Sequence, residues 1–173
     1  MLERVLIAGS GGQGVVLIGR IVATVALPRV PHITFFPSYG AEVRGGTSHC
    51  QVVLSSDEIS SPLSERFDSL ILMNQASCDQ FLPRIEEQGI ALINTSLCRA
   101  PAKAQVVAVP ATAEADRLGN VRAANFIMLG AYIARRKTAD PDEVADAVAK
   151  ALGKKNRELV ELNVKAFRTG LTL

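Results

Sequence analysis

A glycine cluster between two apolar runs near the start of the chain constrains the fold more than any other feature. The segment VLIAGSGGQGVVLIGR, which begins at Val5, joins a strand-like run to a helix-like run. Its glycines have G-x-G-x-x-G spacing, which is typical of a loop that brings backbone N–H groups and a helix N-terminus to a phosphate. The candidate ligand-binding residues of this first glycine loop are Gly9, Gly11, Gly12, Gln13 and Gly14, with Gln13 adding an amide donor.

Beyond this loop, short apolar runs alternate with helical patterns, which is typical of a parallel sheet covered by helices. The predicted strands are residues 4–8, 32–37, 48–55, 68–74, 89–96 and 104–110, and the predicted helices are residues 14–26, 111–119, 120–137, 140–153 and 156–170. With 173 residues and no repeat or linker, we expect one domain over residues 1–173. The predicted fold class is α/β: a single Rossmann-like domain, with a mostly parallel sheet, helices on both faces and a helical C-terminal segment.

Charge and apolar run length exclude two classes of partner. Lysine and arginine exceed aspartate and glutamate by only 19 to 17, so the chain lacks the basic excess of a nucleic-acid binder. The longest apolar stretch, residues 15–27, is broken by Arg20 and is shorter than the roughly 20 residues of a membrane span. We therefore expect a cytoplasmic protein with no nucleic-acid partner and no membrane contact.

The three cysteines give no local metal motif. Cys50, Cys78 and Cys98 form no C-x-x-C pair, so neither a zinc ribbon nor an iron–sulfur cluster is encoded locally, and we expect buried or half-buried free thiols. His49 and Cys50 are adjacent on a predicted strand and point to opposite faces, so they are not expected to share a metal ion. No nucleophile with a base is apparent, and we predict no catalytic residue and no metal ligand in this chain.

The first glycine loop lacks the usual companion of an NAD site. A dinucleotide fold places an acidic residue at the end of the second strand to hold the ribose. Here the second predicted strand runs into Pro37, Ser38 and Tyr39, and the nearest acid, Glu42, lies further along. The loop is thus either a tight turn or an anion site for a ligand other than NAD.

A second glycine-rich segment, PSYGAEVRGGTSH at residues 37–49, follows that strand. Its Arg44 offers a planar fork for a phosphate or carboxylate, and its glycines allow a ligand or backbone to approach closely. An ordered turn with Glu42 paired to Arg44 accounts equally well for these residue types. The candidate ligand-binding residues of this second glycine loop are Ser38, Tyr39, Glu42, Arg44, Gly45 and Gly46.

Five segments together carry a family likeness over nearly the whole chain. They are G-x-G-G-Q-G at residues 9–14, PSYGAEVRGGTSH at 37–49, MNQASCDQF from Met73, LGNVRAANFIMLGAY from Leu118 and ELNVKAFRTG from Glu161. In this order they resemble the gamma subunit of 2-oxoacid:ferredoxin (acceptor) oxidoreductases, which act on pyruvate, 2-oxoglutarate and related oxoacids. The paired glycine loops are the specific part of the likeness.

The resemblance implies a subunit of an enzyme that converts a 2-oxoacid, coenzyme A and oxidised ferredoxin into acyl-CoA, carbon dioxide and reduced ferredoxin. It implies that thiamine diphosphate, magnesium and iron–sulfur clusters belong to alpha, beta and ferredoxin-like delta partner subunits, and that this chain holds no cofactor alone and is inactive alone. It further implies a structural role at the subunit interface and a possible share in coenzyme A binding by the two glycine loops. An isolated gamma chain could also form a homodimer.

Two other functions are compatible with the residues. A free-standing Rossmann-like sensor that binds a nucleotide would explain the first glycine loop but would leave the second one unexplained. An independent NAD-linked dehydrogenase fits worst, because no acid–base residue is placed for hydride transfer.

Overall fold

The computed structural model describes residues 1–39, 47–102, 105–153 and 156–173. Within them, six strands form one sheet in the order β2-β3-β1-β4-β5-β6. The strands are β1 (Leu2–Ser10), β2 (His32–Tyr39), β3 (Thr47–Ser55), β4 (Phe67–Leu72), β5 (Ile85–Asn94) and β6 (Val106–Val109). The pairs β1·β4, β4·β5 and β5·β6 are parallel, whereas β3 runs antiparallel to both of its neighbours, β1 and β2. Five of the six strands therefore point the same way, and the predicted mostly parallel sheet is confirmed.

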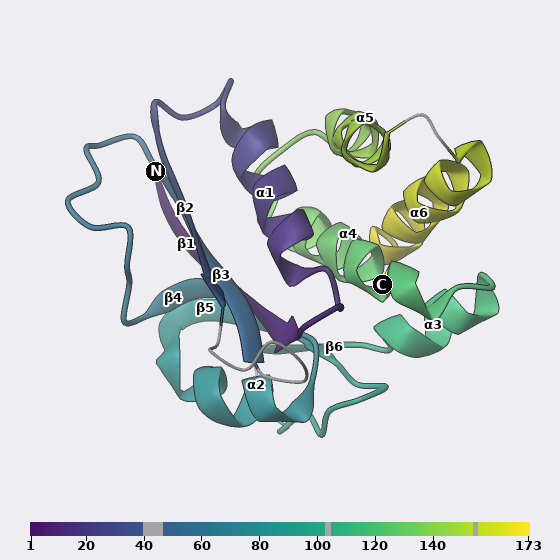
Figure 1. Cartoon of the computed structure of the whole chain (residues 1–173). Helices are drawn as coiled ribbons and strands as arrows, with labels where there is room; N and C mark the ends of the chain where they lie inside the picture. The colour runs from purple at the N-terminus through teal and green to yellow at the C-terminus, as the bar shows by residue number, and fades with distance from the viewer. Residues whose placement is uncertain (40–46, 103–104, 154–155) are drawn as a thin grey trace.

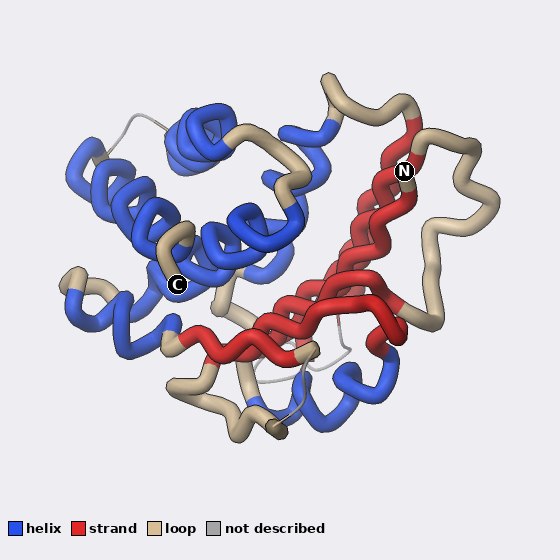
Figure 2. Tube along the Cα trace, turned by 180° about the vertical axis from the view of Figure 1, so that it is seen from behind, coloured by secondary structure: helices blue, strands red, loops and turns tan. Residues whose placement is uncertain are grey.

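Helices cover both faces of the sheet, as predicted (Figure 1). They are α1 (Val15–Ala26), α2 (Gln75–Phe81), α3 (Ala111–Arg117), α4 (Ala124–Arg136), α5 (Pro141–Leu152) and α6 (Arg157–Gly170), with short 3₁₀ turns at Leu82–Arg84 and Val121–Ala123. Figure 2 shows the same layers from behind, with most helices gathered on one side and α2 on the other. The predicted helix 120–137 begins as the 3₁₀ turn Val121–Ala123, because Asn120 caps that turn by accepting from the backbone N–H of Arg122. Helix α2 was not among the predicted helices.

The alternation of strand side chains divides the core in two. On β1, Val5 and Ile7 face α1 and α4, while Leu6 and Ala8 face α2. All four side chains have no exposed surface. Strands that are apolar on both faces read as continuous apolar runs, which is why the sequence predicts their positions well.

Helices α4 and α6 approach each other at backbone contact through a pair of glycines. A Cβ atom added at Gly130 of α4 would overlap the carbonyl oxygen of Phe167 and lie 2.9 Å from the Cα of Gly170. A Cβ atom added at Gly170 would in turn overlap the carbonyl oxygen of Ile127. The glycines therefore set the distance between the two helices.

A buried ion pair fixes the C-terminal end of α4 to the start of β1. Glu3 is 2% exposed, and its carboxylate accepts from the Nε and Nη2 atoms along one edge of the Arg136 guanidinium, with Nε 3.0 Å from Oε1. The Ser69 hydroxyl donates to the same carboxylate at 2.6 Å. Each charge is thereby satisfied, as buried charges must be.

No helix among the described residues is both long and apolar enough to cross a bilayer.

Candidate functional site

The first glycine loop connects the carboxyl end of β1 to α1 through two left-handed residues. Gly12 and Gly14 have φ values of 92° and 72°, a conformation that side-chain-bearing residues rarely adopt. Gly14 is the N-cap of α1, where no side chain caps the first turn and no acidic residue lies within it. The N-terminal N–H groups of α1 and its dipole thus favour a negative charge at this loop.

The Gln13 side chain turns back into the loop. Its Oε1 atom accepts a 2.7 Å hydrogen bond from the Ser10 N–H, and the Gln13 N–H donates to the Ser10 carbonyl at 3.1 Å. The amide oxygen therefore braces the turn, and the NH₂ group is the part of Gln13 that can meet a ligand as the predicted donor.

Polar side chains from the ends of neighbouring strands surround the loop. Asn74, which follows β4, donates to the Ser10 hydroxyl at 2.5 Å and caps α2 by accepting from the Ser77 N–H at 2.9 Å. Asn94, at the end of β5, is fully buried and donates to the Thr112 hydroxyl at 2.9 Å. The sequence analysis did not identify either asparagine as a site residue. The available signal was a polar residue at the end of each apolar strand. They hold the loop, α2 and α3 in one arrangement.

A cavity of about 230 Å³ lies against this loop, at the carboxyl edge of the parallel strands. Open α/β sheets bind ligands at this edge. The lining residues are Gly12, Gln13, Met73, Leu97, Thr112, Val121, Arg122, Ala124 and Asn125. Arg122 is exposed and precedes α4, so the cavity has a cationic side chain at its rim as well as the N-terminus of α1. Its volume is below the roughly 300–1,000 Å³ of sites that enclose a whole drug-sized ligand, so it fits one portion of a nucleotide.

The second glycine loop begins and ends beside the first one. In the sheet, Gly9 pairs with Ser48, and Ser48 pairs with Tyr39, so these three residues form one row across three strands. Ser38 and Tyr39 end β2 at the same edge as the first loop. The remaining predicted residues of the second loop, Glu42, Arg44, Gly45 and Gly46, and the side chain of Tyr39 lie outside the described residues.

The topology also argues against a dinucleotide site of the usual kind. In that fold the ribose acid ends a parallel strand that adjoins the first one. Here β3 adjoins β1 and runs antiparallel, with Thr47 paired to Ser10, so this position is the start of a strand and not its end. The sequence lacks an acidic residue at this position, and the fold places no parallel strand end there to carry one.

His49 and Cys50 lie on opposite faces of β3, as predicted. The His49 ring packs against Phe81 of α2 with ring centroids 5.1 Å apart, and burial together with the nearby Arg84 charge lowers the His49 pKa. Cys50 lies beneath α1, where its thiol donates to the Val15 carbonyl at 3.5 Å. All three cysteines are buried and free, as expected. Among the described residues, no group of three or more His, Cys, Asp or Glu side chains is placed to bind a metal ion.

Comparison with known proteins places the chain in a family. Residues 4–173 match the family model described as pyruvate ferredoxin/flavodoxin oxidoreductase. The chain belongs to this family. Membership confirms the resemblance predicted from the five sequence segments.

Curated relatives carry the domain both within a longer chain and nearly alone. The chain is 37% identical over 170 residues to the ketoisovalerate oxidoreductase subunit VorA of Methanothermobacter marburgensis, covering 96% of this chain and 35% of that protein. It is 31% identical over 168 residues to the 2-oxoglutarate synthase subunit KorC of Archaeoglobus fulgidus, covering 96% and 85%. The chain thus spans about a third of the VorA relative and most of the KorC relative.

Solved structures agree with this fold. The gamma subunit of a keto/oxoacid ferredoxin oxidoreductase from Geobacter sulfurreducens superposes with a TM-score of 0.81 and 29% identity, covering 99% of this chain and 95% of that one. A 2-oxoglutarate:ferredoxin oxidoreductase from Magnetococcus marinus, solved with 2-oxoglutarate, coenzyme A and succinyl-CoA bound, has a TM-score of 0.87 at 22% identity, covering 99% and 30%. The second likeness supports the fold alone.

Proposed function

We propose that this family member is the gamma subunit of a multi-subunit, thiamine-dependent 2-oxoacid:ferredoxin oxidoreductase in the cytoplasm. Its complex converts a 2-oxoacid, coenzyme A and oxidised ferredoxin into acyl-CoA, carbon dioxide and reduced ferredoxin. The observation that carries this proposal is the family match over residues 4–173, together with the likeness to an isolated gamma subunit over nearly the whole of both chains.

The chain contributes coenzyme A binding through its first glycine loop. The uncapped N-terminus of α1, the amide of Gln13 and the guanidinium of Arg122 meet at the 230 Å³ cavity, and each favours a phosphate group. A cavity of this size suits the diphosphate portion of coenzyme A and leaves the rest of the molecule to other surfaces. Coenzyme A is bound in the Magnetococcus marinus enzyme, whose fold this chain shares, so coenzyme A is the first ligand to test.

The second glycine loop completes the site or binds a partner subunit. Ser38 and Tyr39 end at the same edge as the first loop, which supports a shared role for the two segments. Arg44 supplies a further fork for a phosphate or a partner carboxylate. The gamma chain thereby joins the coenzyme A site to the subunit interface.

Thiamine diphosphate, magnesium and the iron–sulfur clusters are held by alpha, beta and ferredoxin-like delta subunits. The cysteines of this chain do not suit a cluster, because Cys50 faces α1 while Cys78 and Cys98 lie on the α2 face of the sheet. This chain's residues therefore bind and orient, and the redox steps take place on its partners.

Calorimetric binding of coenzyme A to the 173-residue chain tests the ligand assignment, with NAD as the comparison ligand. Arg122→Ala removes one charged phosphate contact and is expected to weaken coenzyme A binding about tenfold, or about 1.4 kcal/mol. Arg44→Ala tests the second loop in the same way. Arg157→Ala is the matched control, because this arginine is exposed on α6 and pairs only with Glu161 at 2.7 Å among the described residues.

The outcomes separate the candidate functions. The proposed site is supported if the chain binds coenzyme A, Arg122→Ala weakens this binding and Arg157→Ala leaves it unchanged. Tight binding of NAD would instead favour the free-standing nucleotide-binding sensor, the alternative that the first glycine loop is compatible with. Binding of neither ligand, combined with co-purification and restored activity on adding the alpha, beta and delta subunits, would limit the gamma role to assembly.

A further inference from the structure

Two cysteines that are 20 positions apart in the sequence meet on the α2 face of the sheet. Cys78 lies in α2, and Cys98 lies on the turn that follows β5. They are 3% and 8% exposed and belong to the same apolar cluster. Cys78 also lines one cleft together with Arg99, the residue after Cys98, so the two thiols lie on neighbouring segments of this face.

Backbone hydrogen bonds hold these two segments in place. The Arg99 N–H donates to the Gln75 Oε1 atom at 2.8 Å, which ties the residue after Cys98 to the first turn of α2. Gln75 and Cys78 are three positions apart, so they share one face of that helix. The Cys98 N–H donates to the Asn94 carbonyl at 3.0 Å, which anchors the turn to the end of β5. The first hydrogen bond thus joins the turn to α2, and the second anchors the turn to the sheet.

The two thiols have unequal chemistry. The neighbouring Cys78 thiol favours a Cys98 thiolate and lowers the Cys98 pKa, although burial and the Asp79 charge act in the opposite direction. The neighbouring Cys98 side chain, burial and the Asp79 charge raise the Cys78 pKa. Because the thiolate is the reactive form and Cys98 is also the more exposed thiol, at 8% against 3%, we assign Cys98 as the nucleophile and Cys78 as the second thiol of the pair.

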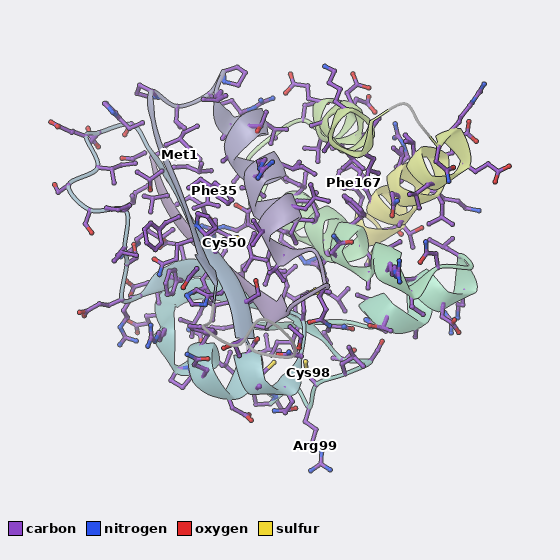
Figure 3. All side chains as sticks on the ribbon, in the orientation of Figure 1. Met1, Phe35, Cys50, Cys98, Arg99 and Phe167 are labelled. Carbon is purple, nitrogen blue, oxygen red and sulfur yellow. The ribbon has the colours of Figure 1, made fainter. Side chains whose placement is uncertain are left out.

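Small oxidants have a path to the pair. A cleft of about 480 Å³ lies over Cys78 and is lined also by Gln75, Asp79 and Arg99. Figure 3 shows the Arg99 side chain extending away from Cys98 toward solvent, so it does not cover the sulfur atoms. Hydrogen peroxide is close to water in size and fits this route.

We propose that Cys78 and Cys98 are a redox pair that hydrogen peroxide converts to an intramolecular disulfide and a dithiol reductant restores. The Cys98 thiolate attacks one peroxide oxygen, an S–O bond forms, the O–O bond breaks, and hydroxide leaves. The Cys78 sulfur then attacks Cys98, the S–S bond forms, and the S–O bond breaks as hydroxide leaves and takes up the Cys78 proton as water. In sum, two thiols and one peroxide give one disulfide and two waters.

The disulfide would join α2 to the turn that carries Leu97, a lining residue of the cavity beside the first glycine loop. A covalent link between residues far apart in sequence restricts the unfolded chain. We therefore expect the oxidised chain to unfold at a higher temperature than the reduced one, with the difference removed by dithiothreitol.

Cys50 provides an internal control. It is fully buried on the opposite face, and burial raises its pKa to about 12. We expect its thiol to stay reduced under conditions that oxidise the pair.

The test is peptide mapping of the 173-residue chain after brief peroxide treatment and alkylation of the remaining thiols. Trypsin cleavage after Arg66, Arg84 and Arg99 places Cys78 in residues 67–84 and Cys98 in residues 85–99. The expected product is these two peptides joined within a monomeric chain, lighter than their sum by two hydrogen atoms and separated by dithiothreitol. A sulfinic acid on either cysteine without a cross-link, a disulfide between chains, or two unreacted thiols in the folded chain would each overturn the proposal.

Single substitutions test the assigned roles, with circular dichroism as the check of folding. In Cys78→Ala, we expect Cys98 to stop at the sulfenic acid, which dimedone traps. In Cys98→Ala, we expect Cys78 to react at least tenfold more slowly than Cys98 does in the native chain. Equal reactivity of the two thiols in these variants would contradict the nucleophile assignment. The peptide map of the native chain tests disulfide formation without either variant.

Discussion

Replacing Gly130 of α4 by alanine tests whether the α4–α6 contact, and not helix propensity, determines stability at this position. In an exposed helix, alanine would stabilise the protein by about 1 kcal/mol relative to glycine. At Gly130 the new Cβ would overlap the Phe167 carbonyl oxygen and lie 2.9 Å from the Gly170 Cα, so the helices must separate. Both obstructing groups are backbone atoms, which cannot rotate out of the way.

The structure sets the scale of the cost. A separation of about 0.5–1 Å forfeits a quarter to a half of each dispersion contact, and a large buried side chain makes about 40–60 contacts of about 0.1–0.2 kcal/mol. If half the contacts of Ile127 and Phe167 cross this interface, the loss is about 2–4 kcal/mol. Subtracting the propensity gain leaves a net destabilisation of about 1–3 kcal/mol, or a Tm lowered by about 3–9 °C for a chain of this size.

Urea denaturation followed by far-UV circular dichroism measures this difference. Gly11→Ala is the matched control, because a Cβ there meets no atom within 4 Å and φ is not left-handed, so we expect a change within about 0.5 kcal/mol. The combined Gly130→Ala and Gly170→Ala change should cost less than the sum of the two, since one separation relieves both overlaps. A Gly130→Ala chain that is more stable than the native one would refute the reasoning.

Two charged contacts of β1 give further expectations. Glu3→Gln removes the buried partner of Arg136 and should lower the free energy of unfolding by about 2 kcal/mol in urea denaturation; an unchanged midpoint would show that the pair contributes nothing net. Burial opposes ionisation of Asp68, but the hydrogen bonds and charge of Arg4 outweigh it and lower the Asp68 pKa. The Arg4–Asp68 contact therefore stabilises the fold fully above the ordinary aspartate pKa. This stabilisation is lost as the pH falls through the lowered pKa. Thermal melts between neutral pH and pH of about 2.5 should therefore show the native chain losing its advantage over Asp68→Asn on acidification, and a constant difference would contradict this assignment.

The sequence predicts the six strands because each contains a short apolar or β-branched run, which is continuous in strands buried on both faces such as β1 and β4. It does not reveal α2, because Gln75–Phe81 is only seven residues long and mixes polar side chains with few apolar ones. The available signal was Asn74, whose side chain caps the helix by accepting from the Ser77 N–H. Short helices of this kind are defined by caps and tertiary contacts more than by periodicity.

The direction of β3 was also open to prediction from the sequence. Only residues 40–46 separate β2 from β3, whereas a parallel crossover needs about a dozen residues or more. A short connection between adjacent strands therefore indicates a hairpin, and hence an antiparallel neighbour for β1.

The candidate site was predictable only in part, because some of its residues are far apart in the sequence. The first glycine loop is contiguous, so its glycine spacing is visible in the sequence. Arg122 and Asn94 reach the same edge from the 3₁₀ turn before α4 and from the end of β5, and no local pattern relates residues so far apart along the chain. Their contribution follows from the strand order, which brings the ends of β1, β4 and β5 together.

The placement of β3 explains why this chain carries two glycine-rich segments where a dinucleotide fold carries one. With β3 antiparallel, the edge beside Ser10 holds Thr47, the start of a strand, and the chain that precedes Thr47 comes from Tyr39 at the same edge. No parallel strand therefore ends beside β1 on this side to supply a ribose-binding acid. The change in topology that removes the determinant for NAD therefore also brings Tyr39 and Thr47, the two ends of the second glycine-rich segment, to the edge at which the first glycine loop begins.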